Sequence, residues 1–233
     1  MIQFFILKGN VCPYAHRTYI TLLELRIPFD LVEIEGSGAH KPDWFLKINP
    51  LGKVPSLAVP TTNETDNDYF AVYESAICNE FLCDYASTTL QREHRLMPAN
   101  DPFARATIRL LNNHGDVFVK SFMSFLRNVD DAEDEELRNK LEAAVAKYED
   151  TLVTNRGPYL LGKEYTMADV HIFPFMRRLV ITLKHFKDYE MPREKFPNVL
   201  SWLDACFERE SAKKSSLSPE KTIESYTRLL RRK

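Results

Sequence analysis

The order of the secondary structure patterns constrains this chain most. The first 85 residues alternate between strand and helix patterns, and the remainder shows helix patterns only. Short apolar runs predict strands at 3–7, 29–34, 54–59 and 69–73, with a polar loop at 61–68, and helical spacing predicts helices at 13–25, 42–48 and 75–85. This βαβαββα order favours a small mixed α/β sheet with helices on both faces.

From about residue 100 the apolar residues recur at helical spacing. This spacing predicts helices at 103–127, 137–152 and 197–207, and Thr166 followed by Asp169 is typical of a capping box that starts another helix. The last twenty-odd residues are charged and show only weak periodicity. The sequence therefore predicts an α/β domain at 1–86 and an all-α domain at 100–233, joined by a linker at 87–99.

Composition argues against several classes of protein. The chain has 233 residues, of which 44% are hydrophobic, so it can bury a substantial core. The net charge is -2, and basic residues gather only in the tail, which argues against nucleic-acid binding. No apolar run approaches the roughly 20 residues that cross a bilayer, and the opening run 2–7 is too short for a signal-peptide core. We therefore expect a cytoplasmic protein with no membrane partner.

The four cysteines show no metal-ligand spacing, so we expect neither a metal site nor a disulfide framework. Cys78, Cys83 and Cys206 lie in apolar helical patterns, which is typical of small core residues. Cys12 differs because it precedes Pro13 at the predicted start of a helix. Free N–H groups at such a position favour a thiolate over a thiol. The sequence therefore predicts that Cys12 is a nucleophile.

Two further segments suit a peptide-like ligand. Val54-Pro55 stands between a turn and a strand, a place that suits a cis prolyl bond, although an ordinary turn proline fits the pattern as well. A cis bond would leave the N–H and C=O of Val54 free to pair with an extended peptide. Glu74 and Ser75 open a helix directly after a strand, where free N–H groups bind a carboxylate and Glu74 can accept from an ammonium. A γ-glutamyl end carries both groups, and a plain helix cap is the alternative.

These segments also carry a family resemblance. CPYA at 12–15, KPDWF at 41–45, NPLGKVP at 49–55 and YESAI at 73–77, followed by a helical second half, resemble a cytosolic glutathione transferase and most nearly the omega class. The resemblance implies a thioredoxin-like domain followed by a helical domain, a homodimer, and glutathione as co-substrate without a metal. It assigns Val54 and Pro55 to the cysteinyl unit of glutathione, Glu74 and Ser75 to its γ-glutamyl end, and Lys41 to its glycyl carboxylate.

Other residues keep two interpretations. Tyr14 could offer its hydroxyl to Cys12 or pack against its helix, and His16 and Arg17 could favour the thiolate or point to solvent. In the helical half, 174–178 resembles an omega-class stretch whose arginine lines the acceptor site, which implies that Arg178 binds the acceptor. The aromatic and apolar candidates for the same pocket are Phe118, Phe122, Met123 and Phe125, although most residues in such a stripe are core.

A cysteine at the active position predicts chemistry at sulfur. A hydroxyl stabilises the glutathione thiolate for attack on an electrophile, whereas a cysteine thiolate itself attacks sulfur. Because Ala15 replaces a second cysteine, glutathione from solution must resolve the mixed disulfide on Cys12. We expect glutathione-dependent thiol transfer, including deglutathionylation and dehydroascorbate reduction, on a small disulfide or electrophilic acceptor. A conjugating or dehalogenating transferase, a non-catalytic scaffold module, and a reductase that uses a polyamine-linked glutathione stay open.

Overall fold

The computed structural model describes residues 1–35, 41–61 and 69–231. The chain packs as two compact units, Met1–His94 and Arg95–Lys233. The first unit contains a four-stranded sheet with helices, and the second contains helices, so the predicted fold class is confirmed. The exact domain limits at 86 and 100 stay a prediction.

The first unit is built on a mixed sheet of four strands. Its strands are β1 (Ile2–Leu7), β2 (Phe29–Ile34), β3 (Ser56–Pro60) and β4 (Tyr69–Tyr73), in the spatial order β2-β1-β3-β4. β1 runs parallel to β2 and antiparallel to β3, and β3 runs antiparallel to β4. The helices are α1 (Pro13–Glu24), α2 (Asp43–Ile48) and α3 (Ser75–Thr88), with a short 3-10 turn η1 (Lys8–Asn10). Most of the polar loop predicted at 61–68 lies outside the described residues.

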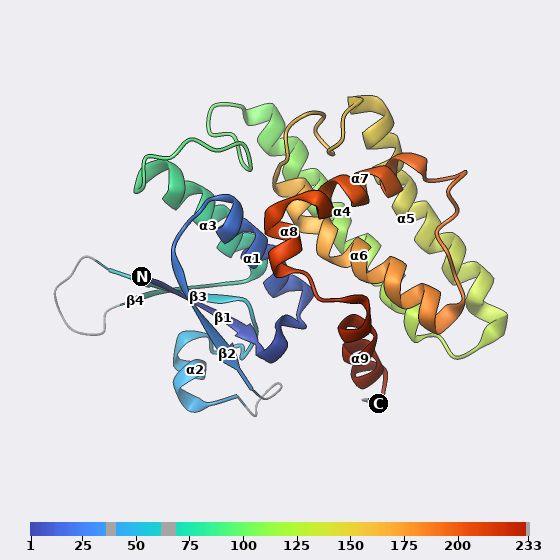
Figure 1. Cartoon of the computed structure of the whole chain (residues 1–233), viewed down its shortest axis with the longest axis horizontal. Helices are drawn as coiled ribbons and strands as arrows, with labels where there is room; N and C mark the ends of the chain where they lie inside the picture. Colours follow the sequence, from blue (N-terminus) through green and yellow to red (C-terminus); the bar gives the residue numbers. More distant parts are fainter. Residues whose placement is uncertain (36–40, 62–68, 232–233) are drawn as a thin grey trace. The chain divides into compact units, whose positions relative to one another are not determined.

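Side-chain alternation along β1 explains why helices cover both faces of this sheet. Successive strand residues point to opposite faces, so Phe4 and Phe5 are buried on different sides. The Phe4 ring lies 5.8 Å from the ring of Tyr19 on α1, and the Phe5 ring lies 5.7 Å from that of Phe45 on α2. Figure 1 shows the result, with α1 and α3 above the sheet and α2 below it.

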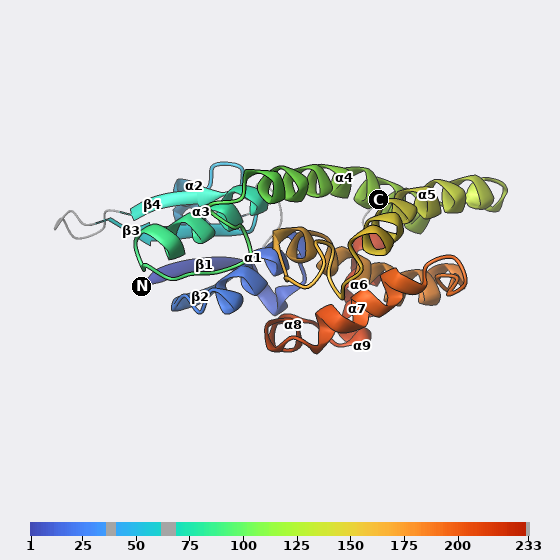
Figure 2. The same cartoon turned by 90° about the horizontal axis from the view of Figure 1, so that it is seen from above.

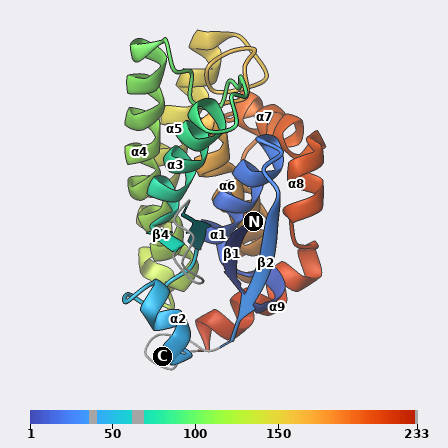
Figure 3. The same cartoon turned by 90° about the vertical axis from the view of Figure 1, so that its left-hand side faces the viewer.

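The second unit is a bundle of helices. They are α4 (Pro102–Arg127), α5 (Asp134–Asn155), α6 (Met167–Lys187), α7 (Pro197–Glu208), α8 (Glu210–Ser215) and α9 (Pro219–Leu230), with a 3-10 turn η3 (Asp131–Glu133) before α5. Figures 2 and 3 show α6 between α4 and α7. Because α6 has neighbours on both sides, most of its length is buried, including both Phe173 and Phe175.

The start of α6 confirms the predicted capping box. The Asp169 carboxylate accepts hydrogen bonds from the backbone N–H of Thr166 at 2.8 Å and from the Thr166 hydroxyl at 3.1 Å. It also accepts from Leu160 N and from the indole N–H of Trp202 on α7, each at 2.8 Å. Burial raises the pKa of Asp169, while these hydrogen bonds favour its ionised form. One buried carboxylate therefore joins a loop and two helices.

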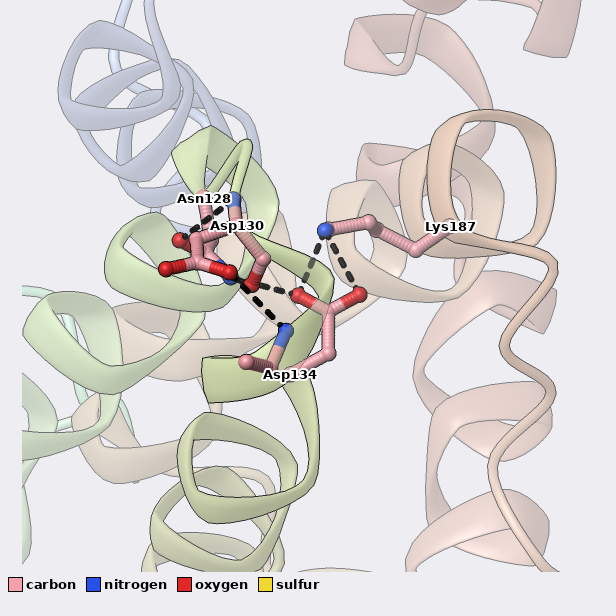
Figure 4. A network of polar contacts seen from close by, with 5 residues as sticks. Asn128, Asp130, Asp134 and Lys187 are labelled. Carbon is pink, nitrogen blue, oxygen red and sulfur yellow. Dashed lines mark hydrogen bonds and ion pairs between the residues drawn. The ribbon is translucent and has the colours of Figure 1, made fainter.

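A second polar network holds the corner between α4 and α5 (Figure 4). The Lys187 ammonium lies 2.6 and 2.8 Å from the two carboxylate oxygens of Asp134, and Asn128 Nδ2 donates to the same carboxylate at 2.7 Å. These donors hold the pKa of Asp134 below its usual range. The C-terminal end of α6 is thus tied to the first residue of α5.

The C-terminal segment contains more helix than its sequence pattern indicates. We expected weak periodicity after α7, and the structure instead contains α8 and α9. Ser218 caps α9 by accepting from Lys221 N, and Pro219 occupies the first helical turn, two start signals that are present in the sequence. Within the described residues, no helix combines the length and apolar character that crossing a membrane requires.

Candidate active site

Cys12 occupies the N-cap of α1. Its backbone is extended (φ −79°, ψ 119°), Pro13 follows at the first helical position, and Cys12 O accepts the first hydrogen bond of the helix, from His16 N at 3.0 Å. The side chain is partly exposed, whereas Cys78, Cys83 and Cys206 are buried, as the sequence predicts. Burial raises the pKa of the Cys78 thiol far above its usual value. Among the four cysteines, Cys12 has the access and helix position that sulfur chemistry needs.

Val54 faces the sulfur of Cys12. The Cys12 thiol donates to Val54 O across 3.7 Å, which joins residues 42 positions apart in the sequence. The Val54–Pro55 peptide bond is cis, as the sequence predicts. An acceptor on the backbone that precedes a strand is therefore available beside the candidate nucleophile.

Asn49 shapes the turn that carries Val54 and Pro55. Its side chain is 1% exposed, and its Nδ2 donates to Lys53 O at 2.8 Å and to Ser56 Oγ at 3.0 Å. Gly52 takes a positive φ of 61° in the same turn, which a residue without a Cβ adopts at low cost. Sequence reasoning gave Asn49 no role, because a buried amide that bonds a turn four residues away looks like an ordinary loop residue.

Glu74 and Ser75 lie where the polypeptide leaves β4 and enters α3. Glu74 is exposed and has a positive φ of 67°, an uncommon conformation for a residue with a Cβ. Ser75 is the first helical residue and is buried. Strained backbone of this kind is concentrated at functional sites, and the free N–H groups of α3 start here. The segment can bind an anion, with Glu74 as an acceptor for a neighbouring cation.

Lys41 places an ammonium in a buried position. It is 6% exposed, and its Nζ has no hydrogen-bond partner among the described residues. The ammonium lies 5.6 Å from the centroid of the Phe45 ring. Burial lowers the pKa of Lys41, and the charge on Cys12 acts in the opposite direction. A buried ammonium that interacts with Cys12 in this way is suited to receive an anionic ligand.

The first turns of α1 are more buried than the sequence suggested. His16 is 0% exposed and Arg17 is 2% exposed, so the interpretation that these side chains point to solvent is wrong. Arg17 Nη1 donates to Ser75 Oγ at 3.2 Å, and its guanidinium lies 5.0 Å from the Tyr14 ring centre. Tyr14 itself is 41% exposed. The structure thus brings Arg17 to Ser75, a pairing across 58 residues that no local pattern indicates.

The second unit contains the residues that were predicted to line the binding site of the acceptor substrate. Arg178 is buried within α6, and its Nη1 donates to Pro174 O at 2.9 Å. Phe118, Phe122 and Phe125 are buried and contact other aromatic rings of the bundle, as expected for a core stripe. A role of Arg178 in binding an acceptor stays a prediction.

Two family models match the chain, one in each unit. The model of the glutathione S-transferase N-terminal domain matches residues 11–84, and the model of the C-terminal domain of the same family matches residues 108–215. The chain belongs to the glutathione S-transferase family. The first match contains Cys12, Val54 and Ser75, so these residues of the candidate site lie in the N-terminal domain of the family.

Several members of the glutathione S-transferase family are similar to this chain over most of its length. Glutathione S-transferase DHAR3, chloroplastic, from Arabidopsis thaliana is 26% identical over 93% of this chain and 73% of its own length. Glutathione transferase Omega 3C from Trametes versicolor is 27% identical, with a TM-score of 0.80 over 99% of this chain and 90% of that chain. Leishmania TDR1, a trimeric glutathione transferase, has a TM-score of 0.82 at 26% identity, and this chain spans 49% of its length.

Proposed function

We propose that this chain is a glutathione-dependent thiol transferase in which Cys12 is the nucleophile. The observation that carries the proposal is the partly exposed Cys12 at the N-cap of α1, with its sulfur 3.7 Å from Val54 O. The other three cysteines are buried. Relatives named as DHAR and omega-class transferases support the same activity.

Glutathione fits the polar groups of the first unit as an extended peptide. Its γ-glutamyl carboxylate and ammonium suit the α3 N-terminus at Ser75 and the Glu74 carboxylate. Its glycyl carboxylate suits the buried ammonium of Lys41. Its cysteinyl amide suits Val54, which brings the two sulfur atoms together.

Val54 O links substrate binding to activation of the nucleophile. In the free protein this oxygen accepts from the Cys12 thiol. When the cysteinyl N–H of glutathione donates to the same oxygen, it competes with the hydrogen bond from the Cys12 thiol, which weakens an interaction that favours the neutral thiol. The free N–H groups at the start of α1 then favour the thiolate.

The reaction proceeds by two exchanges at sulfur. The Cys12 thiolate attacks the glutathione sulfur of a mixed disulfide, and the acceptor leaves as a thiolate that takes a proton from water. Cys12 now carries glutathione in a disulfide bond. The thiolate of a second glutathione attacks that glutathione sulfur, which releases glutathione disulfide and restores the Cys12 thiolate. With dehydroascorbate as acceptor, two glutathione molecules supply the two electrons and two protons that form ascorbate.

The variant Cys12→Ser tests the nucleophile. We expect turnover of a glutathionylated peptide and of dehydroascorbate to fall by at least a thousandfold, because serine does not form a disulfide. Conjugation of an aryl halide is expected to persist, since a hydroxyl can still hold a glutathione thiolate. Cys206→Ala is the matched control, because Cys206 is buried in α7, and its turnover should equal that of the wild type.

The same assays separate the alternatives. Wild-type activity on the aryl halide alone would replace this proposal with a conjugating transferase. If the wild type showed no turnover and released no heat on titration with glutathione, the result would favour a non-catalytic scaffold module. Thiol transfer that survives in Cys12→Ser would move the nucleophile to another residue.

Two further parts of the proposal concern the cell and the assembly. We propose a homodimer in the cytoplasm, as the family resemblance implies. The relatives differ on both points, because the name of one includes the word chloroplastic and another is described as trimeric. Fractionation of cells and light scattering of the purified chain test the two statements separately.

A further inference from the structure

We infer that Arg17 is a positioning residue for glutathione, which holds Ser75 in the orientation that binds the γ-glutamyl carboxylate. This inference rests on the proposed function, since it concerns the same thiol substrate. It is carried by the hydrogen bond from Arg17 Nη1 to Ser75 Oγ, 3.2 Å long and buried between α1 and α3.

Two of the polar contacts between α1 and α3 differ in charge. Thr18 Oγ1 donates to Asn79 Oδ1 at 2.8 Å, a neutral contact between buried side chains. The other junction uses a guanidinium that is 2% exposed. Burying a charge is costly, and the neighbouring contact shows that neutral groups can join these helices. The Arg17 guanidinium contacts the N-terminal end of α3, where free N–H groups attract an anion. A role in binding such an anion would explain why a charge is buried at this contact.

The direction of the hydrogen bond fixes the role of the serine. A guanidinium only donates, so Ser75 Oγ must act as the acceptor of this bond. The hydroxyl proton of Ser75 is then left to donate to another group. A γ-glutamyl carboxylate at the start of α3 is an acceptor for that proton. Arg17 therefore sets the hydroxyl as a donor toward the ligand before the ligand arrives.

Arg17 also belongs to the helix that starts at Cys12. The guanidinium lies 5.0 Å from the ring centre of Tyr14, in the first turn of α1. The same side chain thus contacts the helix of the nucleophile and the first residue of α3. This arrangement fixes the span between Cys12 and the anchor of the γ-glutamyl end, on which the approach of the two sulfur atoms depends.

The test uses a substrate analogue that lacks one group. In 4-aminobutyryl-cysteinyl-glycine, hydrogen replaces the α-carboxylate of the γ-glutamyl unit. The wild type should prefer glutathione over this analogue by KM. In Arg17→Gln we expect the KM for glutathione to rise about tenfold, with kcat changed less than about twofold. The KM for the analogue should stay the same, so the preference is lost.

Thr18→Val is the matched control. It removes the neutral junction with Asn79 on the same helices, so it should lower stability and leave the preference for glutathione unchanged. Arg17→Lys keeps the charge without the forked donors and should regain part of the preference. If Arg17→Gln does not fold, Arg17→Lys carries the same comparison with both substrates.

A double-mutant cycle with Ser75→Ala completes the test. Because Arg17 acts through Ser75, the double variant should bind S-methylglutathione no more weakly than Ser75→Ala alone. Additive losses, or an equal rise in KM for glutathione and the analogue, would overturn the role of Arg17. A wild type without thiol transfer would instead overturn the proposed function, while the calorimetric cycle would still decide the role of Arg17.

Discussion

Lys41 shows how a single residue connects binding to sulfur chemistry. Its ammonium is buried, interacts with Cys12, and has no hydrogen-bond partner among the described residues. Under the proposed function this ammonium receives the glycyl carboxylate of glutathione, and it also attracts the charge that forms on Cys12 when the thiol ionises. A thiol whose glycyl carboxylate is joined to a polyamine offers an amide and a positive charge instead. We therefore expect the chain to prefer free glutathione over the polyamine-linked form that the sequence left open.

The lowered pKa of Lys41 gives a testable pH dependence. The ammonium is charged below its pKa, which burial moves down from 10.5. The attraction for the glycyl carboxylate is therefore complete near neutral pH and is lost as the pH rises, earlier than for an exposed lysine. Calorimetry with S-methylglutathione measures this loss without titration of a ligand thiol. Lys41→Arg should keep full affinity over the same range, because its guanidinium stays charged.

Charge removal at Lys41 has a matched control on α2. Lys41→Met should weaken binding of S-methylglutathione by about thirtyfold at neutral pH, or ~2 kcal/mol, because a charged hydrogen bond is lost. Lys47→Met removes an exposed lysine of α2, the helix that begins two residues after Lys41, and should have no effect. Equal affinity of Lys41→Met and the wild type would separate Lys41 from the glycyl carboxylate.

At the scale of elements, two helix N-termini carry the candidate site. α1 starts at Cys12 and α3 starts after Glu74, and both starts were predicted because their signals are local: proline after cysteine, and acid-serine after a strand. The contact between Arg17 and Ser75 was missed because the two residues are 58 positions apart in the sequence. The helices α8 and α9 were missed because both are short and rich in charged residues, and the stability of such helices comes from tertiary packing, which the sequence pattern does not reveal.

The start of α6 gives a prediction about stability. Asp169→Ala removes four hydrogen bonds and leaves the indole N–H of Trp202 and the N–H of Leu160 buried without their acceptor. We expect the free energy of unfolding to fall by about 3 kcal/mol, measured by urea denaturation. Asp150→Ala, at an exposed position of α5, is the control and should change stability by less than about 0.5 kcal/mol. A small effect of Asp169→Ala would show that the loop before α6 is held by other contacts.

At the scale of the whole molecule, the residues that we assign to glutathione and to the acceptor belong to different units. The residues assigned to glutathione all belong to Met1–His94, whereas Arg178 belongs to Arg95–Lys233. The proposed function therefore assigns thiol binding to the first unit. The choice of acceptor is assigned to the second, whose aromatic residues mostly form its own core. Kinetic constants for glutathione should follow changes in the first unit, and acceptor preference should follow Arg178.

The surface of the first unit leads to a prediction about assembly. Phe70 on β4 is 57% exposed, and its ring lies 6.2 Å from that of Phe81 on α3, a helix on which Ile77 is 60% exposed. Exposed apolar groups that lie together on a surface commonly mark interfaces. Because closed two-fold dimers are the commonest assemblies, light scattering should give a mass twice the 27.1 kDa of the chain.

Phe70→Glu should shift this mass toward a single chain, since it places a charge in the contact. Val129→Glu, at an 89% exposed position of the second unit, should leave the dimer intact. A trimer or a monomer for the wild type would contradict the dimer, and a Phe70→Glu dimer would move the interface elsewhere.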